Sequence, residues 1–525
     1  MFRPFRKVLI ANRGEIAVRI ARACHALGIR VAAIHSDAEA DALHVRCADE
    51  AHPCGPAPAR ESYLCAERIV EIARACGADA IHPGYGFLSE NGDFAELCTA
   101  AGIAWIGPPA AVIRRMGDKV VARRTMQQAG VPVVPGATER LSDQAVAHAA
   151  QQLGFPVLVK ATRGGGGRGM RAVHEASELP AALARARSEA GASFGDDGVY
   201  VEKLIVRARH IEVQLLADAH GNVLHLFERD CSAQRRHQKL VEEAPAPGLP
   251  EGLRERLCAA ALSAARAVDY VSAGTVEFLL AADGEFYFLE MNTRIQVEHP
   301  VTEAVTGVDL VQAMIRVAAG EALGLRQADA ALRGHAIEAR IYAEDPARGF
   351  FPSPGRLSVF RAPSGSGLRV DAGVEAGAEV SIHYDALLAK LVAVAETREA
   401  ARARLDAALA DFAVAGVRTS IPFQRWLLRQ AAFRSGNLDV GFVERSWPKG
   451  GAGPLDPAAT AAAIAVARAA LGAAPSLPVE RPAPDLYVVE AAAGRCEAAV
   501  TLRPKVVDVL LAGDLFSFPR EQLLP

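Results

Sequence analysis

The segment Phe286–Pro300, with the sequence FYFLEMNTRIQVEHP, carries polar side chains that could do chemistry. If the segment is extended, alternate residues point to one face, because side chains of a strand alternate with a period of two. That face would consist of Glu290, Asn292, Arg294, Gln296 and Glu298. So many polar groups after an apolar run are costly unless they meet ligands or one another. A solvated strand face explains single charges, but poorly explains hard-cation ligands, a guanidinium and a carboxylate together.

A further carboxylate, Glu277, lies within the apolar stretch Gly274–Leu280, which we expect to be a strand. If this strand neighbours Phe286–Glu290, Glu277 and Glu290 could bridge magnesium ions bound to phosphate oxygens. Taken alone, Glu277 could equally belong to a buried ion pair.

A third polar segment places cationic and amide donors within six residues. These donors are Gln234, Arg235, Arg236, His237 and Lys239. Such a run is usually a solvated face. Because it follows a predicted strand and precedes a proline turn, a loop docked on an anionic substrate is an equal alternative. Cys231 lies just before this run, and we interpret it as a small packed residue.

The glycine run Gly164–Gly169 satisfies a G-x-G-x-x-G pattern, but it joins a strand ending at Lys160 to a strand starting at Met170. A dinucleotide site needs a strand, a loop and then a helix, so that interpretation fails. The sequence also has no Gly-Lys dipeptide and hence no Walker A loop. Backbone N–H groups of such a run can approach phosphates closely, with Arg168 adding charge; a plain flexible hairpin is the alternative.

The elements that position these groups fall into successive regions. Residues 1–115 repeat strand–helix–strand units, beginning with Lys7–Ala11, Glu15–Leu27 and Arg30–His35, and Gly28 ends the first helix. This pattern predicts a parallel α/β domain with a Rossmann-like arrangement. Residues 116–320 have more isolated strands and glycine-rich turns, which indicates an α+β region.

Residues 334–447 form a third region with strands at Ala336–Ile341 and Leu387–Ala393 and a helix at Glu399–Phe412. Residues 448–525 begin with a linker rich in Gly, Pro and Ala. After it we predict a small remnant of three strands, at Leu486–Ala492, Glu497–Leu502 and Lys505–Leu511.

Composition narrows the function classes. The 525 residues are 51% apolar and 23% charged, which is typical of a globular protein of three or four domains. The net charge of −3 argues against nucleic-acid binding, and no apolar run could span a bilayer. Nine scattered cysteines without a Cys-x-x-Cys pair argue against disulfides and a zinc site. Because Met1–Arg6 leads directly into the first strand, we expect no signal peptide and a cytoplasmic location.

Seven motifs, taken together and in this order, resemble the biotin carboxylase family of ATP-grasp enzymes over about Phe5 to Trp447. They are Asn12–Ala17, His82–Asn91, Met116–Lys119, Gly164–Gly169, Gln234–Lys239, Glu290–Pro300 and Glu338–Arg340. The resemblance implies an ATP-grasp fold at 116–320 with a mobile lid at about 135–202. It also implies an N-terminal Rossmann-like domain at 1–115 and a C-terminal biotin carboxylase domain at 334–447. For 448–525 a partner-docking role is a hypothesis.

The resemblance also implies roles for the matched residues. ATP would contact Lys119, Lys160, Gly165, Gly166, Gly167, Glu202, Leu204, His210, Gln234 and His237. Magnesium (or manganese) would bind Glu277, Glu290 and Asn292. Bicarbonate would bind Lys239, Arg294, Gln296, the backbone N–H of Val297, and Glu298. Glu298 would be the base that deprotonates bicarbonate, and Lys239 and Arg294 would be catalytic with it. Tyr85 and Arg340 would lie at the biotin site, where Arg340 stabilises the biotin enolate.

The implied reaction is the first half-reaction of an acyl-CoA carboxylase, in which ATP and bicarbonate carboxylate biotin through carboxyphosphate. An Ala-Met-Lys-Met biotinylation motif is absent, and the last methionine is Met314, so either biotin would arrive on another polypeptide or this chain is a fragment of a longer one. The resemblance implies a homodimer that works with a biotin carboxyl carrier protein and with a carboxyltransferase subunit. The alternatives are another ATP-grasp ligase or a non-catalytic carboxylase subunit. The acceptor is not identified: the acetyl-, propionyl-, methylcrotonyl- and geranyl-CoA carboxylases, pyruvate carboxylase and urea carboxylase all remain open. The effect of Arg163, at a position where the family usually has a small residue, is not identified either.

Overall fold

The computed structural model describes residues 4–137, 140–162, 170–194, 196–448, 465–466, 485–491, 494–502, 506–511 and 514–519. Arg163 and the predicted phosphate-binding residues Gly165, Gly166 and Gly167 lie outside these ranges, as does most of the predicted linker. Within the described ranges, every helix falls short of the length and apolarity that crossing a bilayer requires.

The N-terminal region is a five-stranded parallel sheet with strand order β3-β2-β1-β4-β5, covered by helices. Its strands are β1 (Lys7–Ile10), β2 (Arg30–Ser36), β3 (Glu50–Gly55), β4 (Ala80–His82) and β5 (Ala104–Trp105). Its helices are α1 (Gly14–Ala26), α2 (Leu43–Arg46), α3 (Ala66–Ala75), α4 (Gly92–Ala100) and α5 (Ala110–Gly117). The positive φ of 71° at Gly28 confirms the predicted glycine stop after α1. The predicted parallel α/β region is therefore confirmed.

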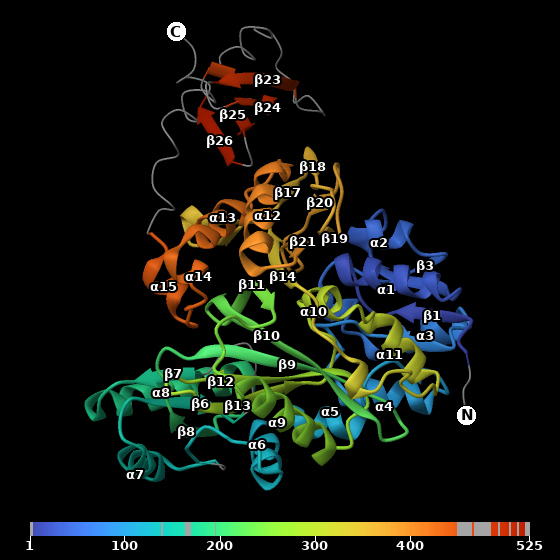
Figure 1. Cartoon of the computed structure of the whole chain (residues 1–525). Coiled ribbons are helices and arrows are strands. Elements are labelled where there is room, and N and C mark those ends of the chain that lie inside the picture. The colour runs from blue at the N-terminus through green and yellow to red at the C-terminus, as the bar shows by residue number, and fades with distance from the viewer. Residues whose placement is uncertain are drawn as a thin grey trace.

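An eight-stranded sheet, with all its pairings antiparallel, forms the centre of the molecule (Figure 1). In spatial order it contains β13 (Phe286–Asn292), β12 (Ser272–Leu280), β9 (Arg209–Ala217), β10 (Val223–Arg235), β11 (Gln238–Ala244), β14 (His335–Tyr342), β21 (Leu387–Ala395) and β19 (Leu368–Ala372). This one sheet takes strands from both residues 116–320 and residues 334–447, which the sequence patterns had separated into two regions. Long-range pairing of β11 with β14 joins them, and local periodicity carries no signal for it.

Four helices flank this sheet and the N-terminal region: α6 (Lys119–Gln128), α9 (Leu253–Ala267), α10 (His299–Thr306) and α11 (Leu310–Ala318). A separate three-stranded sheet in the order β7-β6-β8 contains β6 (Val157–Ala161), β7 (Met170–Val173) and β8 (Val199–Lys203). Helices α7 (Asp143–Leu153) and α8 (Leu179–Phe194) pack on it around a small apolar core that includes Val146 and Val159. Figure 1 shows this unit beside the end of the central sheet that carries β13.

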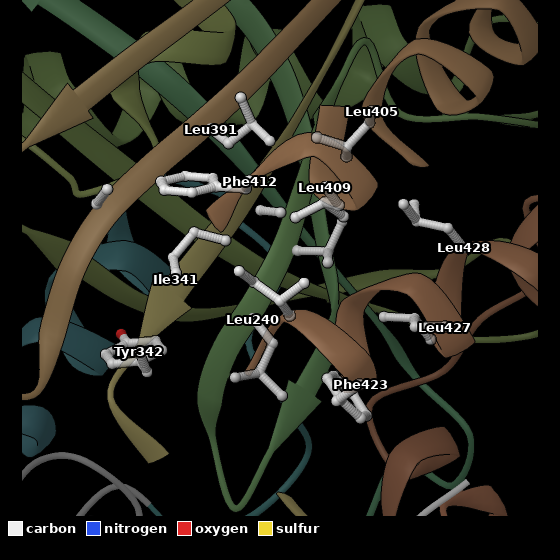
Figure 2. Packing of buried hydrophobic residues seen from close by; sticks show 14 of the residues in the cluster. Leu240, Ile341, Tyr342, Leu391, Leu405, Leu409, Phe412, Phe423, Leu427 and Leu428 are labelled. Atoms are coloured by element: carbon white, nitrogen blue, oxygen red, sulfur yellow. The ribbon is translucent and has the colours of Figure 1, made fainter. Parts of the chain in front are cut away.

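The C-terminal region buries the largest apolar cluster, part of which Figure 2 shows. Helices α12 (Arg398–Asp411) and α13 (Ile421–Arg429) place Leu409 and Phe423 against Leu240 and Ile341 of the central sheet. Short elements complete the region: α14 (Ala431–Arg434), α15 (Phe442–Ser446), and the pairs β15 (Glu344–Asp345) with β16 (Phe351–Pro352), β17 (Gly355–Arg356) with β20 (Glu379–Val380), and β18 (Val359–Arg361) with β22 (Ala413–Ala415). This packing anchors β11 and β14, which both contribute to the site.

The C-terminal tail is a four-stranded antiparallel sheet, whereas three strands were predicted. It contains β23 (Asp485–Ala491), β24 (Gly494–Leu502), β25 (Val506–Leu511) and β26 (Asp514–Pro519). The missed strand, β26, is defined by its pairing with β25 rather than by its own composition. Figure 1 shows this sheet next to the C-terminal region.

Candidate active site

The segment that follows β13 leaves the extended conformation, so the predicted single strand face is wrong beyond Asn292. Glu90 of the N-terminal region accepts a hydrogen bond from the Thr293 backbone N–H (3.1 Å) and one from Arg294 Nε (3.0 Å). The chain then turns, and Glu298 becomes the N-cap residue of α10. Contacts with another region and a helix start, rather than strand alternation, therefore gather the polar residues.

The Lys239 ammonium lies among three buried carboxylates. Its Nζ is 2.5 Å from Glu212 Oε2, 2.8 Å from Glu277 Oε1 and 2.5 Å from Glu298 Oε1. Burial alone would lower the pKa of Lys239, but the three carboxylates together raise it well above its ordinary value. Because β9, β11, β12 and the start of α10 each contribute one residue, the cluster exists only in the folded sheet.

Glu298 is fully buried and is held between two cations. Arg340 Nη2 donates a hydrogen bond of 2.8 Å to Glu298 Oε2, while Lys239 engages the other oxygen. Burial would raise the pKa of Glu298, but Lys239 and Arg340 hold it well below its ordinary value. Glu298 is therefore an ionised carboxylate in a water-poor site.

The predicted metal ligands lie together on neighbouring strands. Glu277 and Glu290 face each other in the register of β12 and β13, and Asn292 Nδ2 donates to Glu277 Oε1 (2.9 Å). Burial and the negative charge of Glu277 raise the pKa of Glu290, and no hydrogen bond or ion pair engages the Glu290 carboxylate within the described part of the chain. Two close carboxylates, one of them unengaged, suit a hard divalent cation.

A cavity of ≈ 250 Å³ opens beside this carboxylate pair. Lys119, Lys160, Glu202, Glu290 and Asn292 are among its lining residues. Glu202 holds Lys160 through an ion pair of 2.7 Å and Arg123 through one of 2.9 Å. Burial lowers the pKa of Lys119, whereas the Glu202 charge outweighs burial and raises that of Lys160. The cavity thus presents cations and carboxylates together, as a metal–polyphosphate complex requires.

Other predicted nucleotide contacts lie around rather than in this cavity. Leu204 follows β8, and its backbone N–H donates to the Pro156 carbonyl. His210 Nε2 lies 3.0 Å from Glu277 Oε2. Gln234 is buried at the end of β10, while His237 is exposed in the hairpin turn to β11.

The predicted donor run Gln234–Lys239 is therefore a tight hairpin. Arg236 and His237 form its two-residue turn with φ values of 47° and 66°, as a type I′ connection requires. Arg236 is exposed, and Arg235 is half-buried and stacks on the Phe350 ring at 4.5 Å. Gln234 and Lys239 face each other across the pair. Neither a solvated face nor a free loop describes the whole run.

The structure also places the remaining predicted site residues. Gln296 Nε2 donates to Glu277 Oε1 (3.1 Å), and Lys390 Nζ donates to the Val297 carbonyl (2.9 Å). The Tyr85 hydroxyl donates to Glu15, whose carboxylate also pairs with Lys390 at 3.0 Å. Cys231 is buried 4.0 Å from Glu298, which agrees with its interpretation as a packed residue.

Sequence reasoning missed two buried residues that support the cluster. Arg229 bonds Glu212 (2.6 Å), Gln214 (2.7 Å) and Thr302 (2.8 Å), and Glu212 in turn holds Lys239. Glu212 could have been found from the sequence, because it is a charged residue within the apolar strand Arg209–Ala217, just as Glu277 is in its own strand.

Comparison with known proteins agrees with this geometry. The family description "Biotin carboxylase, N-terminal domain" matches residues 4–113 and "Biotin carboxylase C-terminal domain" matches residues 338–445. Between them, "Carbamoyl-phosphate synthase L chain, ATP binding domain" matches residues 118–326. Biotin carboxylase of Pseudomonas aeruginosa is 51% identical over 441 residues, which are 84% of this chain and 98% of that protein. The chain belongs to the biotin carboxylase family. It is thus a member of a family of ATP-dependent ligases.

The relatives of this chain are parts of several different enzymes. One pyruvate carboxylase subunit of Methanothermobacter thermautotrophicus is 52% identical over 84% of this chain and 90% of its own length. The alpha subunit of the mitochondrial methylcrotonoyl-CoA carboxylase of Oryza sativa is 54% identical over 84% of this chain, but the match spans only 60% of that longer protein. The predicted family is confirmed, while the predicted acyl-CoA type is not, since the relatives differ in acceptor.

Solved biotin carboxylase structures confirm the predicted ATP-grasp fold class. The biotin carboxylase domain dimer of Hydrogenobacter thermophilus 2-oxoglutarate carboxylase, in complex with MgADP, ADP and bicarbonate, has a TM-score of 0.82 at 47% identity and covers 84% of this chain and 98% of that one. Rhizobium etli pyruvate carboxylase has a TM-score of 0.81 at 44% identity, covering 87% of this chain and 42% of that chain.

Proposed function

We propose that this chain catalyses the ATP- and magnesium-dependent carboxylation of biotin, using bicarbonate and a biotin group borne on a carrier protein. The observation that carries the proposal is the buried, ionised Glu298 held between Lys239 and Arg340. A carboxylate kept charged in a closed site can take a proton from a bound acid, and cations beside it can hold that acid as an anion.

In the proposed first step, bicarbonate binds among Lys239, Arg294, Gln296, the Val297 backbone N–H and Glu298. Its oxygen attacks the γ-phosphoryl group of ATP, its proton passes to Glu298, and ADP leaves. When Lys239 turns toward bicarbonate, it no longer lowers the pKa of Glu298 so strongly, which makes that carboxylate a better base. The products are carboxyphosphate and ADP.

In the proposed second step, carboxyphosphate breaks into CO₂ and phosphate, phosphate takes the proton from the biotin ring nitrogen, and that nitrogen bonds to CO₂. Arg340 stabilises the enolate form of biotin by its fixed positive charge, with Tyr85 near the same pocket. Carboxyphosphate reacts with water, so closure of a lid at about 135–202 would protect it.

The nucleotide is proposed to lie in the cavity lined by Lys119, Lys160 and Glu202, with Gly165–Gly167, Leu204, His210, Gln234 and His237 as further contacts. Glu277, Glu290 and Asn292 fit a magnesium site, because they offer hard oxygen atoms of which Glu290 is unengaged in the described structure. Magnesium there would neutralise phosphate charge during transfer.

We further propose the domain boundaries 1–115, 116–320 and 334–447, a homodimer, and partnership with a biotin carboxyl carrier and a carboxyltransferase of acyl-CoA type. For the tail at 448–525 we propose partner docking. A truncated variant ending at Trp447 should retain biotin carboxylation and bind the transferase less tightly; unchanged binding would refute the docking role.

The test measures ADP release with and without bicarbonate and with and without free biotin. Wild-type protein should show bicarbonate-dependent release that biotin stimulates. Glu298→Gln should lower kcat by about 10²- to 10⁴-fold, the range for loss of a general base. A matched control is Glu228→Gln, since Glu228 is equally buried but pairs with Arg254 outside the cluster. Absence of biotin stimulation, even with a biotinylated carrier added, would refute the proposed function.

A further inference from the structure

Two carboxyl groups face each other in the middle of the central sheet. Glu242 on β11 and Glu338 on β14 are paired in register, and both residues are 0% exposed. None of their four carboxyl oxygens has a hydrogen-bond partner among the residues that the structure describes. Glu338 begins the Glu338–Arg340 motif, but no role has been assigned to it or to Glu242.

Two negative charges directly opposite each other in a buried sheet repel strongly. Burial, and then neighbouring carboxylates, raise the pKa of Glu338 well above its ordinary value; burial raises that of Glu242 to about 7. The pair therefore tends to carry one charge, which stays on Glu242 because Arg340 is beside it. Lys390, opposite Arg340 on β21, already contacts Glu15 and the Val297 carbonyl.

The charge on Glu242 lies against Arg340, which is two residues beyond Glu338 on the same face of β14. Arg340 Nε is 2.6 Å from Glu242 Oε1, and Arg340 Nη2 is 2.8 Å from Glu298 Oε2. The first contact is an ion pair without hydrogen-bond alignment, since both atoms lack a hydrogen-bond partner within the described ranges. The Arg340 guanidinium is thus attracted to Glu242 at its Nε atom and donates a hydrogen bond to Glu298 from its Nη2 atom.

We propose that Glu242 is a positioning residue that holds the Arg340 guanidinium in place for the biotin-dependent step. This inference rests on the proposed function, in which Arg340 meets biotin. Glu242 acts through Arg340 and does not itself touch a substrate. Because Glu242 is not among the residues that line the nucleotide cavity, nucleotide binding should not depend on it.

The test compares Glu242→Gln with the matched control Glu338→Gln, which alters an equally buried carboxyl in the same register pair. Glu242→Gln should lower kcat for biotin-stimulated ADP release by about 10- to 100-fold, the scale of a misplaced catalytic group, with the KM for ATP within about twofold of wild type. Glu338→Gln should change kcat by less than about threefold, since that carboxyl is already neutral.

A double-mutant cycle separates positioning from general support of the fold. If Glu242 acts through Arg340, adding Glu242→Gln to Arg340→Gln should cause no further loss of biotin-stimulated turnover. Equal losses in both backgrounds, or equal effects of the two glutamate variants, would overturn the inference. A crystal structure of Glu242→Gln gives a readout independent of activity: the guanidinium should leave its place beside Glu298, and an unmoved Arg340 would also overturn it. An inactive wild type would instead refute the proposed function.

Discussion

Replacement of Lys239 by glutamine should destabilise the folded protein strongly and in a pH-dependent way. The variant leaves Glu212, Glu277 and Glu298 buried without the ammonium that contacts all three at 2.5–2.8 Å. Removing one partner of a buried ion pair costs about 3–5 kcal/mol. For a large domain this corresponds to a fall in Tm of roughly 5–15 °C.

The sign of the pH dependence follows from the carboxylates. Lys239 and other cations hold the pKa of Glu277 and Glu298 below the ordinary value of 4.5, so this stabilisation is present above that value and is lost as pH falls through the lowered values. Without Lys239, these buried carboxylates take up protons at higher pH. The loss in Tm should therefore be largest near about pH 8 and shrink toward about pH 5.5.

Differential scanning calorimetry at both pH values measures this effect. The matched control is Lys203→Gln, because the Lys203 ammonium donates to the neutral Gly154 carbonyl at 2.8 Å. Lys203→Gln should shift Tm by less than about 3 °C at either pH. A Lys239→Gln loss that is as small as the control, or equal at the two pH values, would refute the reasoning.

Three further predictions concern other parts of the molecule. Burial lowers the pKa of His82 from 6.5 to about 3, so stability should fall as pH drops below 6.5, by up to roughly 4 kcal/mol. His82→Asn should flatten the dependence of Tm on pH, and an unchanged dependence would contradict this reasoning. Gly274→Ala would place its Cβ 2.2 Å from the Tyr270 hydroxyl oxygen, so the free energy of unfolding should fall by about 1–3 kcal/mol, measured as a lower Tm. Gly324→Ala is the control, because no atom lies within 4 Å of its added Cβ, and it should leave Tm nearly unchanged. Glu290→Gln should raise the magnesium concentration needed for half-maximal ADP release by about tenfold or more, and an unchanged requirement would contradict a metal-binding role.

Much of the site was predictable from residue types because its chemistry is unusual for a folded interior. Glu277, Glu290 and Glu298 follow or interrupt apolar strands, where a buried carboxylate needs a partner; Glu277 and Glu298 are buried and Glu290 is half-buried. The same argument would have predicted a role for Glu212. It would not have predicted one for Arg229, because polar residues are common at the ends of strands. The identity of each partner could not be predicted, because partners come from strands far apart in the chain.

Ordered motifs and local periodicity were enough to identify the family and to predict the parallel N-terminal region. They also predicted which residues bind phosphate, cation and bicarbonate, and those roles stay predictions. Tertiary packing sets the turn of the chain after Asn292, the pairing of β11 with β14 in one sheet, and the position of Lys239 among three carboxylates. It also decided that Glu242 faces both Glu338 and Arg340. The reason is physical: register between distant strands and the charge balance of a buried cluster are set by long-range packing, which no local pattern records.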